Sequence, residues 1–250
     1  MNQETRHRLP SFYLTDSAPC PYIEGLSERK LFTHLVGDSA DEMHNKLTQS
    51  GFRRSQGMAY RPACETCVAC RSVRVCVDFF KPSKNMKRVL ARNKHLTRHI
   101  LPPSASREQY DLLRRYLDQR HVSGGMNEMT SLDYINMIEE TAVDTQLIEY
   151  RDQLGRLVAC LLRDRMNDGF SLVYTFFDPS LDHLSLGTYV VLDQIADAKT
   201  IGLPYAYLGY FIAEVENMAY KGRFKPLEEL KSNGWEPLID IAPLAYTRRT

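Results

Sequence analysis

The chain has 250 residues, which is enough for one large domain or two smaller ones. Its 43% apolar and 25% charged residues are typical of a soluble globular protein, and its net charge of +1 excludes a uniformly basic or acidic chain. No apolar run approaches the ~20 residues that a membrane-spanning helix needs, and the N-terminus lacks the apolar core of a signal peptide. We therefore expect a cytoplasmic protein with no membrane partner.

The first sixty residues predict a small layer of strands and one helix. The run RKLFTHLV, residues 29–36, favours a strand. Asp38 or Ser39 can cap a helix that runs through Met43 and Leu47 and stops at Gly51. A short strand is expected at residues 58–61.

Three cysteines then follow at two-residue spacing, namely Cys64, Cys67 and Cys70. This spacing lets thiolates reach one metal ion, and Cys20, about forty residues upstream, offers a fourth sulfur. Four thiolates suit either a structural zinc ion or an iron–sulfur cluster. The alternative is that these cysteines are reduced thiols in a tight loop.

Two further cysteines indicate a packing role instead. Cys76 falls inside a strand pattern, on the face opposite Val73 and Val75, and Cys160 lies in the apolar run LVACLL. Buried thiols behave as small hydrophobic side chains, so we expect both to be structural.

A strand with alternating Val73, Val75, Val77 and Phe79 leads into a basic segment. Residues 79–107 contain no Asp or Glu. On a helix, Lys84, Arg88 and Arg92 would share one face. The apolar residues that can face the core are Met86, Val89, Leu90 and Leu96. A solvated helix face is the simple alternative, but in a nearly neutral chain this segregation of charge favours a polyanionic partner such as nucleic acid.

The second half predicts two helices, at residues 106–121 and 132–140, and then a sheet. Strands are expected at 145–151, 156–165 and 170–178, joined by hairpin turns, and are followed by a helix at 185–200 and a strand at 205–211. This order predicts an α+β fold with a GNAT-like acyltransferase core at residues 101–250. The small cysteine-containing domain would occupy residues 1–100.

In a GNAT-like fold the helix after the meander offers its first amides to an anion. Here those amides belong to Ser185, Leu186 and Gly187. The glycine-rich loop that cradles coenzyme A, Q/R-x-x-G-x-G/A, is absent, because this segment holds a single glycine. Coenzyme A is therefore not the expected donor.

Several motifs in sequence order resemble the aminoacyl-tRNA–protein transferases of the arginyltransferase type, and most closely their short bacterial branch. The resemblance covers nearly the whole chain. Its motifs are PCPY (19–22), YRPACETCVACRSVRV (60–75), Ser83 with Lys87-Arg88, Arg120-His121 with Gly124-Gly125-Met126, VYTFFDP (173–179), SLGTY (185–189), LPYAYLGY (203–210) and YKGRFKPLE (220–228).

The resemblance implies transfer of an amino acid from charged tRNA to the α-amine of a protein that begins with Asp or Glu, with a product that enters the N-degron pathway. For the short bacterial branch the donor is expected to be leucyl-tRNA. Three alternatives remain: arginyl-tRNA as the donor, a coenzyme A-dependent GNAT acetyltransferase, and a non-catalytic RNA-binding module. No cofactor is needed for catalysis in the leading interpretation.

The chemistry of such a transfer asks little of the protein beyond positioning. The aminoacyl ester is already activated, and an α-amine with a pKa near 7.7–8.0 is partly unprotonated at cytosolic pH. The site needs a proton acceptor and donors for the oxyanion. Our candidates for oxyanion or ribose contacts are Tyr174, Tyr189, Tyr207 and Tyr210, with strand packing as the alternative. Asp178 is a candidate proton acceptor or amine ligand, or else a turn residue before Pro179.

An acidic first residue needs a cationic pocket, and Lys221 is our first choice because the family motif carries a lysine there. The further substrate-binding candidates are Arg223, Arg71, Arg74, Arg120, Ser185 and Gly187, and the tRNA-binding candidates are Lys84, Lys87, Arg88 and Arg92. The chain departs from the family pattern in two places. Acidic Glu214 and Glu216 stand in a stretch that is usually basic or small, and Asp182-His183-Leu184 replaces an arginine before Ser185.

Overall fold

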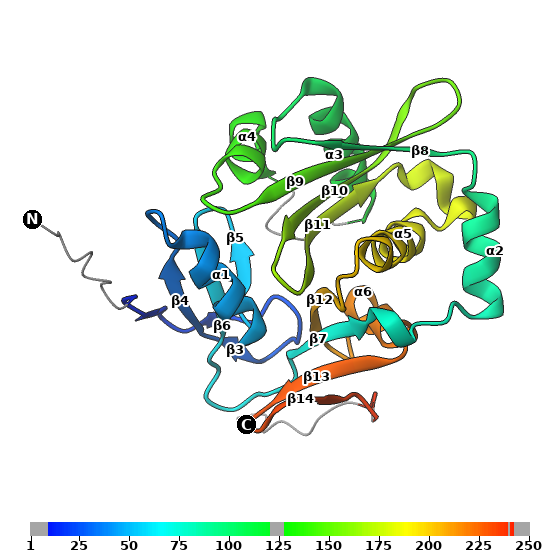
Figure 1. The fold of residues 1–250 in the computed structure, drawn as a ribbon. Coiled ribbons are helices and arrows are strands. Elements are labelled where there is room, and N and C mark those ends of the chain that lie inside the picture. The colour runs from blue at the N-terminus through cyan, green and yellow to red at the C-terminus, as the bar shows by residue number, and fades with distance from the viewer. Residues whose placement is uncertain (1–9, 121–127, 240, 243–250) are drawn as a thin grey trace, which may run out of the picture.

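The computed structural model describes residues 10–120, 128–239 and 241–242. The chain forms a mixed α+β fold with one eight-stranded sheet, one four-stranded sheet and a two-stranded ribbon, β2 (Ala18–Pro19) with β3 (Ser27–Glu28). Figure 1 shows the four-stranded sheet on the left, beside the larger layer. The expected α+β class is therefore confirmed.

The large sheet is mostly antiparallel, in the order β14-β13-β7-β12-β11-β10-β9-β8. Its centre follows the prediction to within a residue or so, as β9, β10, β11 and β12 show. The bounds are β7 Arg71–Cys76, β8 Thr97–Leu101, β9 Thr145–Arg151, β10 Leu157–Arg165, β11 Gly169–Phe177, β12 Tyr205–Phe211, β13 Leu227–Lys231 and β14 Gly234–Pro237. Among the described strand pairs, only β11 and β12 run parallel.

Helices cover both faces of this sheet, because its central strands are apolar on both sides. On one face lie α2 (Lys84–Arg92) and α5 (Leu186–Thr200), over residues such as Ile148 and Leu161. On the other lie α3 (Arg107–Arg120) and α4 (Ser131–Glu139), over Leu147 and Cys160. Cys160 is fully buried, which confirms its structural role, whereas Cys76 is only half-buried.

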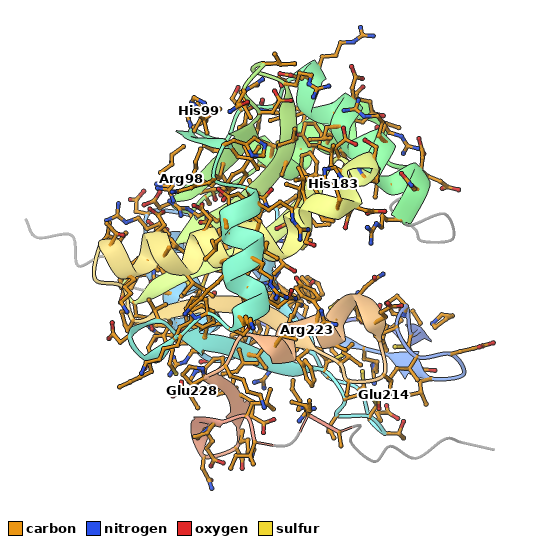
Figure 2. The ribbon with its side chains drawn as sticks, turned by 90° about the vertical axis from the view of Figure 1, so that its right-hand side faces the viewer. Arg98, His99, His183, Glu214, Arg223 and Glu228 are labelled. Atoms are coloured by element: carbon orange, nitrogen blue, oxygen red, sulfur yellow. The ribbon has the colours of Figure 1, made fainter. Side chains whose placement is uncertain are left out.

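The basic helix α2 forms as predicted and has a clear cap. The Ser83 hydroxyl oxygen accepts a hydrogen bond from the Met86 amide at 3.3 Å. Met86, Val89 and Leu96 are buried, and Leu90 packs against the same core. Figure 2 shows α2 lying in front of α5, with the helix exposed along its outer side.

The four-stranded sheet has the order β1-β4-β6-β5, with α1 (Ala40–Gln49) on one face. The strands β4 (Lys30–His34) and β6 (Met58–Pro62) confirm two predictions. Ser39 is the N-cap residue of α1, although its side chain makes no capping bond. The strands β1 (Tyr13–Leu14) and β5 (Arg53–Ser55) are absent from the prediction.

Three further details differ from the expectation. The strand expected through Phe79 ends at Cys76, because the Val77 amide donates to Pro204 O at 2.8 Å and residues 77–79 turn into a 3-10 helix. The edge strand β8 and the hairpin β13–β14 were not predicted.

The large sheet includes β7 and β8 as well as the later strands, so it extends across residue 100. The division into two domains at that residue stays a prediction. The motif residues His121, Gly124, Gly125 and Met126 lie outside the described residues.

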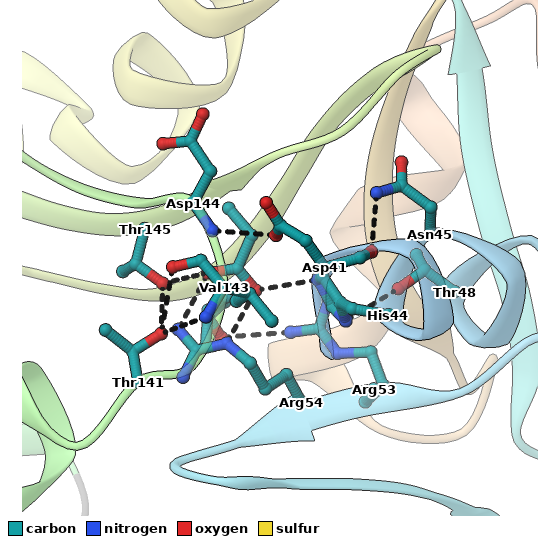
Figure 3. A network of polar contacts seen from close by, with 12 residues as sticks. Asp41, His44, Asn45, Thr48, Arg53, Arg54, Thr141, Val143, Asp144 and Thr145 are labelled. Carbon is teal, nitrogen blue, oxygen red and sulfur yellow. Dashed lines mark hydrogen bonds and ion pairs between the residues drawn. The ribbon is translucent and has the colours of Figure 1, made fainter. Parts of the chain in front are cut away.

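A buried ionic network joins the small sheet to the large one. Arg54 on β5 donates from Nε and Nη2 to the Asp164 carboxylate on β10, at 2.7 Å each. His44 Nε2 lies 3.1 Å from the same carboxylate, and Thr145 Oγ1 donates to it at 2.8 Å. Figure 3 shows the surrounding contacts between α1, β5 and the start of β9. Burial alone raises the pKa of Asp164, but the hydrogen bond from His44 and the charge of Arg54 lower this pKa to about 2.

We expect Asp164→Asn to lower the free energy of unfolding at pH 7 by roughly 3–5 kcal/mol, because it leaves the buried Arg54 without a counter-charge. A depressed carboxyl pKa stabilises the fold above pH 4 and loses this contribution as the pH falls toward 2. The wild-type protein should therefore lose about 2 kcal/mol more than the variant across that window. Urea unfolding followed by circular dichroism measures both quantities.

The matched control is Asp118→Asn, which removes an exposed carboxylate paired with Arg114 on α3. Its effect should stay within about 0.5 kcal/mol. An equal effect of the two substitutions would contradict the role given to the buried network.

Candidate active site

The candidate site is built where the parallel strands β11 and β12 separate. They pair only from Gly169 opposite Tyr205 to Ser171 opposite Tyr207. The rest of β11, to Phe177, does not pair with β12. At the same point β11 carries a bulge, because Leu162 faces Tyr174 while the next residue of β10 faces Leu172. Separation of a parallel pair exposes backbone groups that need new partners.

Arg53, from β5 of the small sheet, supplies those partners. Its Nη2 donates to Leu172 O and Val173 O, both at 2.9 Å. The guanidinium packs so closely on Gly209, where φ is +76°, that a Cβ there would lie 2.5 Å from Cζ. The prediction missed Arg53, because an arginine in a short strand resembles a solvent-facing residue.

Lys221, the first-choice anion ligand, lies in the 3-10 helix Tyr220–Arg223 and is buried. Its Nζ donates to Tyr210 O at 2.6 Å and lies 3.3 Å from Met218 Sδ. Burial, and then the positive charge of Arg53, lower the pKa of Lys221 to about 7. Arg223, labelled in Figure 2, is exposed.

Two of the four predicted tyrosines already have partners for their hydroxyl groups. Tyr207 donates to Asp168 at 2.8 Å and accepts from Arg74 Nη1 at 3.1 Å. Tyr210 has the backbone oxygens of Gly51, at 3.2 Å, and Tyr60, at 3.1 Å, within reach of its hydroxyl. Burial raises the pKa of both phenols, so both are neutral at physiological pH.

The other two tyrosines are held by ring packing. Tyr174 packs on Phe176 with centroids 6.3 Å apart, and Tyr189 meets Tyr150 edge-on at 5.7 Å. Burial raises the pKa of each phenol. Within the described residues neither hydroxyl has a hydrogen-bond partner, so each is a neutral donor at physiological pH.

The residues around the start of α5 form a tight turn. The Asp178 Oδ1 atom accepts from the amide of Ser180 at 2.9 Å and from its hydroxyl at 2.6 Å, the pattern of a cap for the 3-10 helix η3 (Pro179–Leu184). Ser185 has a left-handed backbone, with φ at 53°, and begins α5. Gly187 lies against the Phe177 ring, which a Cβ would approach to 3.0 Å.

The remaining cationic candidates are paired with acids. Arg74 donates to Glu228 at 2.8 Å and stacks on Tyr205 at 3.5 Å, and Arg71 lies 3.7 Å from Glu229. Arg120 binds Asp182 at 2.6 Å on the surface. Arg120 is thus paired with an acidic residue of the segment in which the chain departs from the family pattern.

On α2, the predicted tRNA ligands Lys84, Lys87 and Arg88 are exposed. Arg92 is exposed too, but its Nη1 donates to the backbone oxygen of His183 in η3. The structure therefore keeps three of these four cations available at the surface, on one helix.

A large pocket of about 860 Å³ lies between the small sheet, the cysteine segment and β7. Its wall includes Tyr22, Tyr60 and Tyr210, and all four predicted metal ligands, Cys20, Cys64, Cys67 and Cys70. The predicted residues Tyr174, Lys221 and those of α2 do not line it. The structure thus brings the cysteines together with Tyr210 and Arg71, and keeps the basic helix apart.

The four cysteines fit a thiophilic metal by chemical type, since all four are free thiols on one pocket wall. Burial, and then the neighbouring sulfurs, raise the pKa of Cys70 to about 12. In the described part of the chain, no three potential ligands are arranged closely enough to hold an ion. A metal at this position stays a prediction. Across the same residues, no helix is long and apolar enough to cross a bilayer.

Comparison with known proteins places this site in a class of transferases. The family model described as "Arginine-tRNA-protein transferase, N terminus" matches residues 18–88, and the model described as "Arginine-tRNA-protein transferase, C terminus" matches residues 108–231. The chain belongs to the arginine-tRNA-protein transferase family, whose members are aminoacyl-tRNA–protein transferases.

Curated relatives narrow the similarity within that family. The chain is 52% identical over 241 residues to an aspartate/glutamate leucyltransferase from Afipia carboxidovorans. The match covers 94% of this chain and 95% of the relative. It is 52% identical over 246 residues to the protein of that name from Sinorhizobium medicae, with the same two coverages. Among solved structures, L-PGS from Bacillus licheniformis aligns with a TM-score of 0.44 and 16% identity over 59% of this chain and 48% of that one, a remote likeness only.

The depressed pKa of Lys221 makes a prediction about stability. Between pH 7 and about 10 the unfolded chain holds a proton on this lysine that the folded chain releases, so the lysine makes stability rise with pH in that window. We expect Lys221→Met to remove roughly 1 kcal/mol per pH unit of this slope. Denaturant unfolding at pH 7, 8 and 9 measures the difference from the wild-type protein.

Lys46→Met on the exposed face of α1 is the control, because Lys46 is paired only with Glu42 at the surface. It should leave the slope unchanged. A Lys221→Met protein with the wild-type slope would show that Lys221 keeps an ordinary pKa in the folded state.

Proposed function

We propose that this protein transfers leucine from leucyl-tRNA to the N-terminal α-amine of proteins that begin with Asp or Glu. The observation that carries the proposal is the 52% identity, over nearly the full length of both chains, to relatives named aspartate/glutamate leucyltransferase. The modified proteins would enter the N-degron pathway in the cytoplasm.

The reaction is a single acyl transfer. The unprotonated α-amine nitrogen attacks the ester carbonyl carbon of the leucyl group, and a tetrahedral oxyanion forms. The ester C–O bond then breaks, an amide bond remains, and the proton from the amine goes to the ribose oxygen that leaves. Because the ester is already activated, the protein has to hold the two reactants together and stabilise the oxyanion.

Tyr174 and Tyr189 keep hydroxyls without a partner among the described residues, unlike Tyr207 and Tyr210. They pack into cores on opposite faces of the large sheet, so only one of the two can serve a given oxyanion. Phenols with raised pKa values remain protonated and can donate to an oxyanion. The hydroxyl groups of Tyr207 and Tyr210 are already engaged within the protein, so we give them a positioning role. Asp178, which caps η3, holds the turn that leads to Ser185 and Gly187.

We further propose a GNAT-like arrangement for the core. It is supported by the meander β9–β10–β11, the following helix α5, and the parallel strand β12 that separates from β11. We also retain the four cysteines as holders of a structural zinc ion or iron–sulfur cluster. Elemental analysis of protein purified without chelators checks this, and a content well below one site per chain would reject it.

The transfer assay tests the main proposal. Purified protein should move radiolabelled leucine from leucyl-tRNA onto peptides that begin with Asp or Glu, and not onto a peptide that begins with Ala. Arginyl-tRNA, run beside it, should give little product. Transfer that ignored the first residue, or acylation from acetyl-coenzyme A, would refute the proposal, and RNA binding with no ester turnover would indicate a binding module.

The exposed cations of α2 predict the salt dependence of tRNA binding. Replacing Lys84, Lys87 or Arg88 by Ala should each weaken binding and reduce the slope of log K against log salt by about 1, because one phosphate contact is lost. Filter binding of tRNA at several salt concentrations measures the slope. Lys46→Ala on α1 should keep the wild-type slope, and wild-type slopes in all three α2 variants would exclude α2 as the tRNA contact.

A further inference from the structure

The buried arginines of the described residues each pair with a carboxylate. They are Arg54, Arg71, Arg74 and Arg163. Their carboxylate partners are Asp164, Glu229, Glu228 and Asp197. Such pairing offsets the large cost of removing a guanidinium from water.

Arg53 is the exception among the interior arginines. Its Nη1 atom is fully enclosed and has no hydrogen-bond acceptor in the described residues, and Nη2 meets only the backbone oxygens of Leu172 and Val173. No carboxylate of the described chain forms an ion pair with it. A guanidinium in this position carries an uncompensated positive charge into the interior.

The buried Lys221 adds a second basic side chain to the same region without adding an acid. Its Nζ bonds to a backbone oxygen and lies beside a sulfur, and it too has no carboxylate partner among the described residues. The Arg53 guanidinium packs on Gly209, and Lys221 bonds to the backbone oxygen of the next residue, Tyr210, so the two groups lie in one region. An anion there would offset the charge of Arg53 and favour the protonated form of Lys221.

The large pocket gives an anion its approach to this region. Gly51 and Ser72 line both the large pocket and a small cavity of about 10 Å³ that borders Arg53 and Gly209, so they form a shared wall. Tyr210, which lines the large pocket, directly follows Gly209, on which the Arg53 guanidinium packs. The positive charge of Arg53 therefore lies just behind the pocket wall.

We propose that Arg53 recognises the side-chain carboxylate of the acceptor's first residue. That residue is seated in the large pocket, which Arg53 does not itself line, and its carboxylate is directed past the wall of Gly51 and Ser72 toward Arg53. This rests on the proposed function. Arginine suits the task because its planar fork matches a carboxylate and keeps its charge at every physiological pH. The same site rejects Asn and Gln, whose neutral amides leave the Arg53 charge without compensation.

Equilibrium binding tests the assignment without any turnover. Fluorescence anisotropy with labelled peptides that begin with Asp or Asn gives an Asp-to-Asn affinity ratio for each variant. Arg53→Gln keeps a donor for the carbonyls of Leu172 and Val173 but removes the charge. It should weaken Asp-peptide binding roughly 10- to 100-fold and leave Asn-peptide binding nearly unchanged.

Arg53→Lys keeps the charge but loses the planar fork, so its Asp-to-Asn ratio should lie between those of the wild-type protein and Arg53→Gln. Arg156→Met is the control, because it removes an arginine from an exposed hairpin turn. It should keep the wild-type ratio.

A wild-type Asp-to-Asn ratio in a folded Arg53→Gln protein overturns the proposal. If that variant does not fold, Arg53→Lys decides alone, and a ratio equal to the wild-type value overturns the proposal. The outcome is separate from that of the transfer assay. If Asp-peptide binding depends on Arg53 but the protein transfers no leucine, the proposed function is refuted and the assigned binding site is supported.

Discussion

The separation of β11 from β12 is the constraint on which the rest of the site depends. Two parallel strands that part inside a protein leave carbonyl groups with neither a neighbouring strand nor water to bond. Here Arg53 fills that need by donating to Leu172 O and Val173 O from another sheet. The small sheet docked beside the large one therefore stabilises this opening, with a glycine at position 209 making room for the guanidinium.

The short strand β5 both docks the small sheet on the large one and supplies the donor for the β11 carbonyl groups. Neighbouring residues of a strand point to opposite sides, so Arg53 and Arg54 on β5 reach different strands of the large sheet. Figure 3 labels both arginines. Arg54 binds Asp164 and fixes the position of the small sheet, and Arg53 then enters the opening between β11 and β12. The buried ionic network around Asp164 thereby sets the position of Arg53 in the candidate site.

Local patterns predicted much of the fold and little of the site. The strands β9, β10 and β11 were predicted because their apolar residues are separated by clear turn residues, and α2 because its basic and apolar residues recur at helical spacing. The edge strand β8 was not predicted, since four of its five residues are exposed and show no alternation. Arg53 could not be found from sequence, because its partners Leu172 and Val173 lie about 120 residues away.

The basic helix and the start of α5 are held as one unit by the 3-10 helix η3. Arg92 donates to His183 O, and Asn93, at the end of α2, donates to Leu184 O at 2.8 Å from a buried side-chain amide. From the other side Arg120 binds Asp182 at 2.6 Å. The exposed face of α2, our proposed tRNA contact, thus belongs to an element fixed to Ser185 and Gly187 at the N-terminus of α5. Because Gly187 also packs on Phe177, the last residue of β11, the position of this surface is set relative to the strand that carries Tyr174.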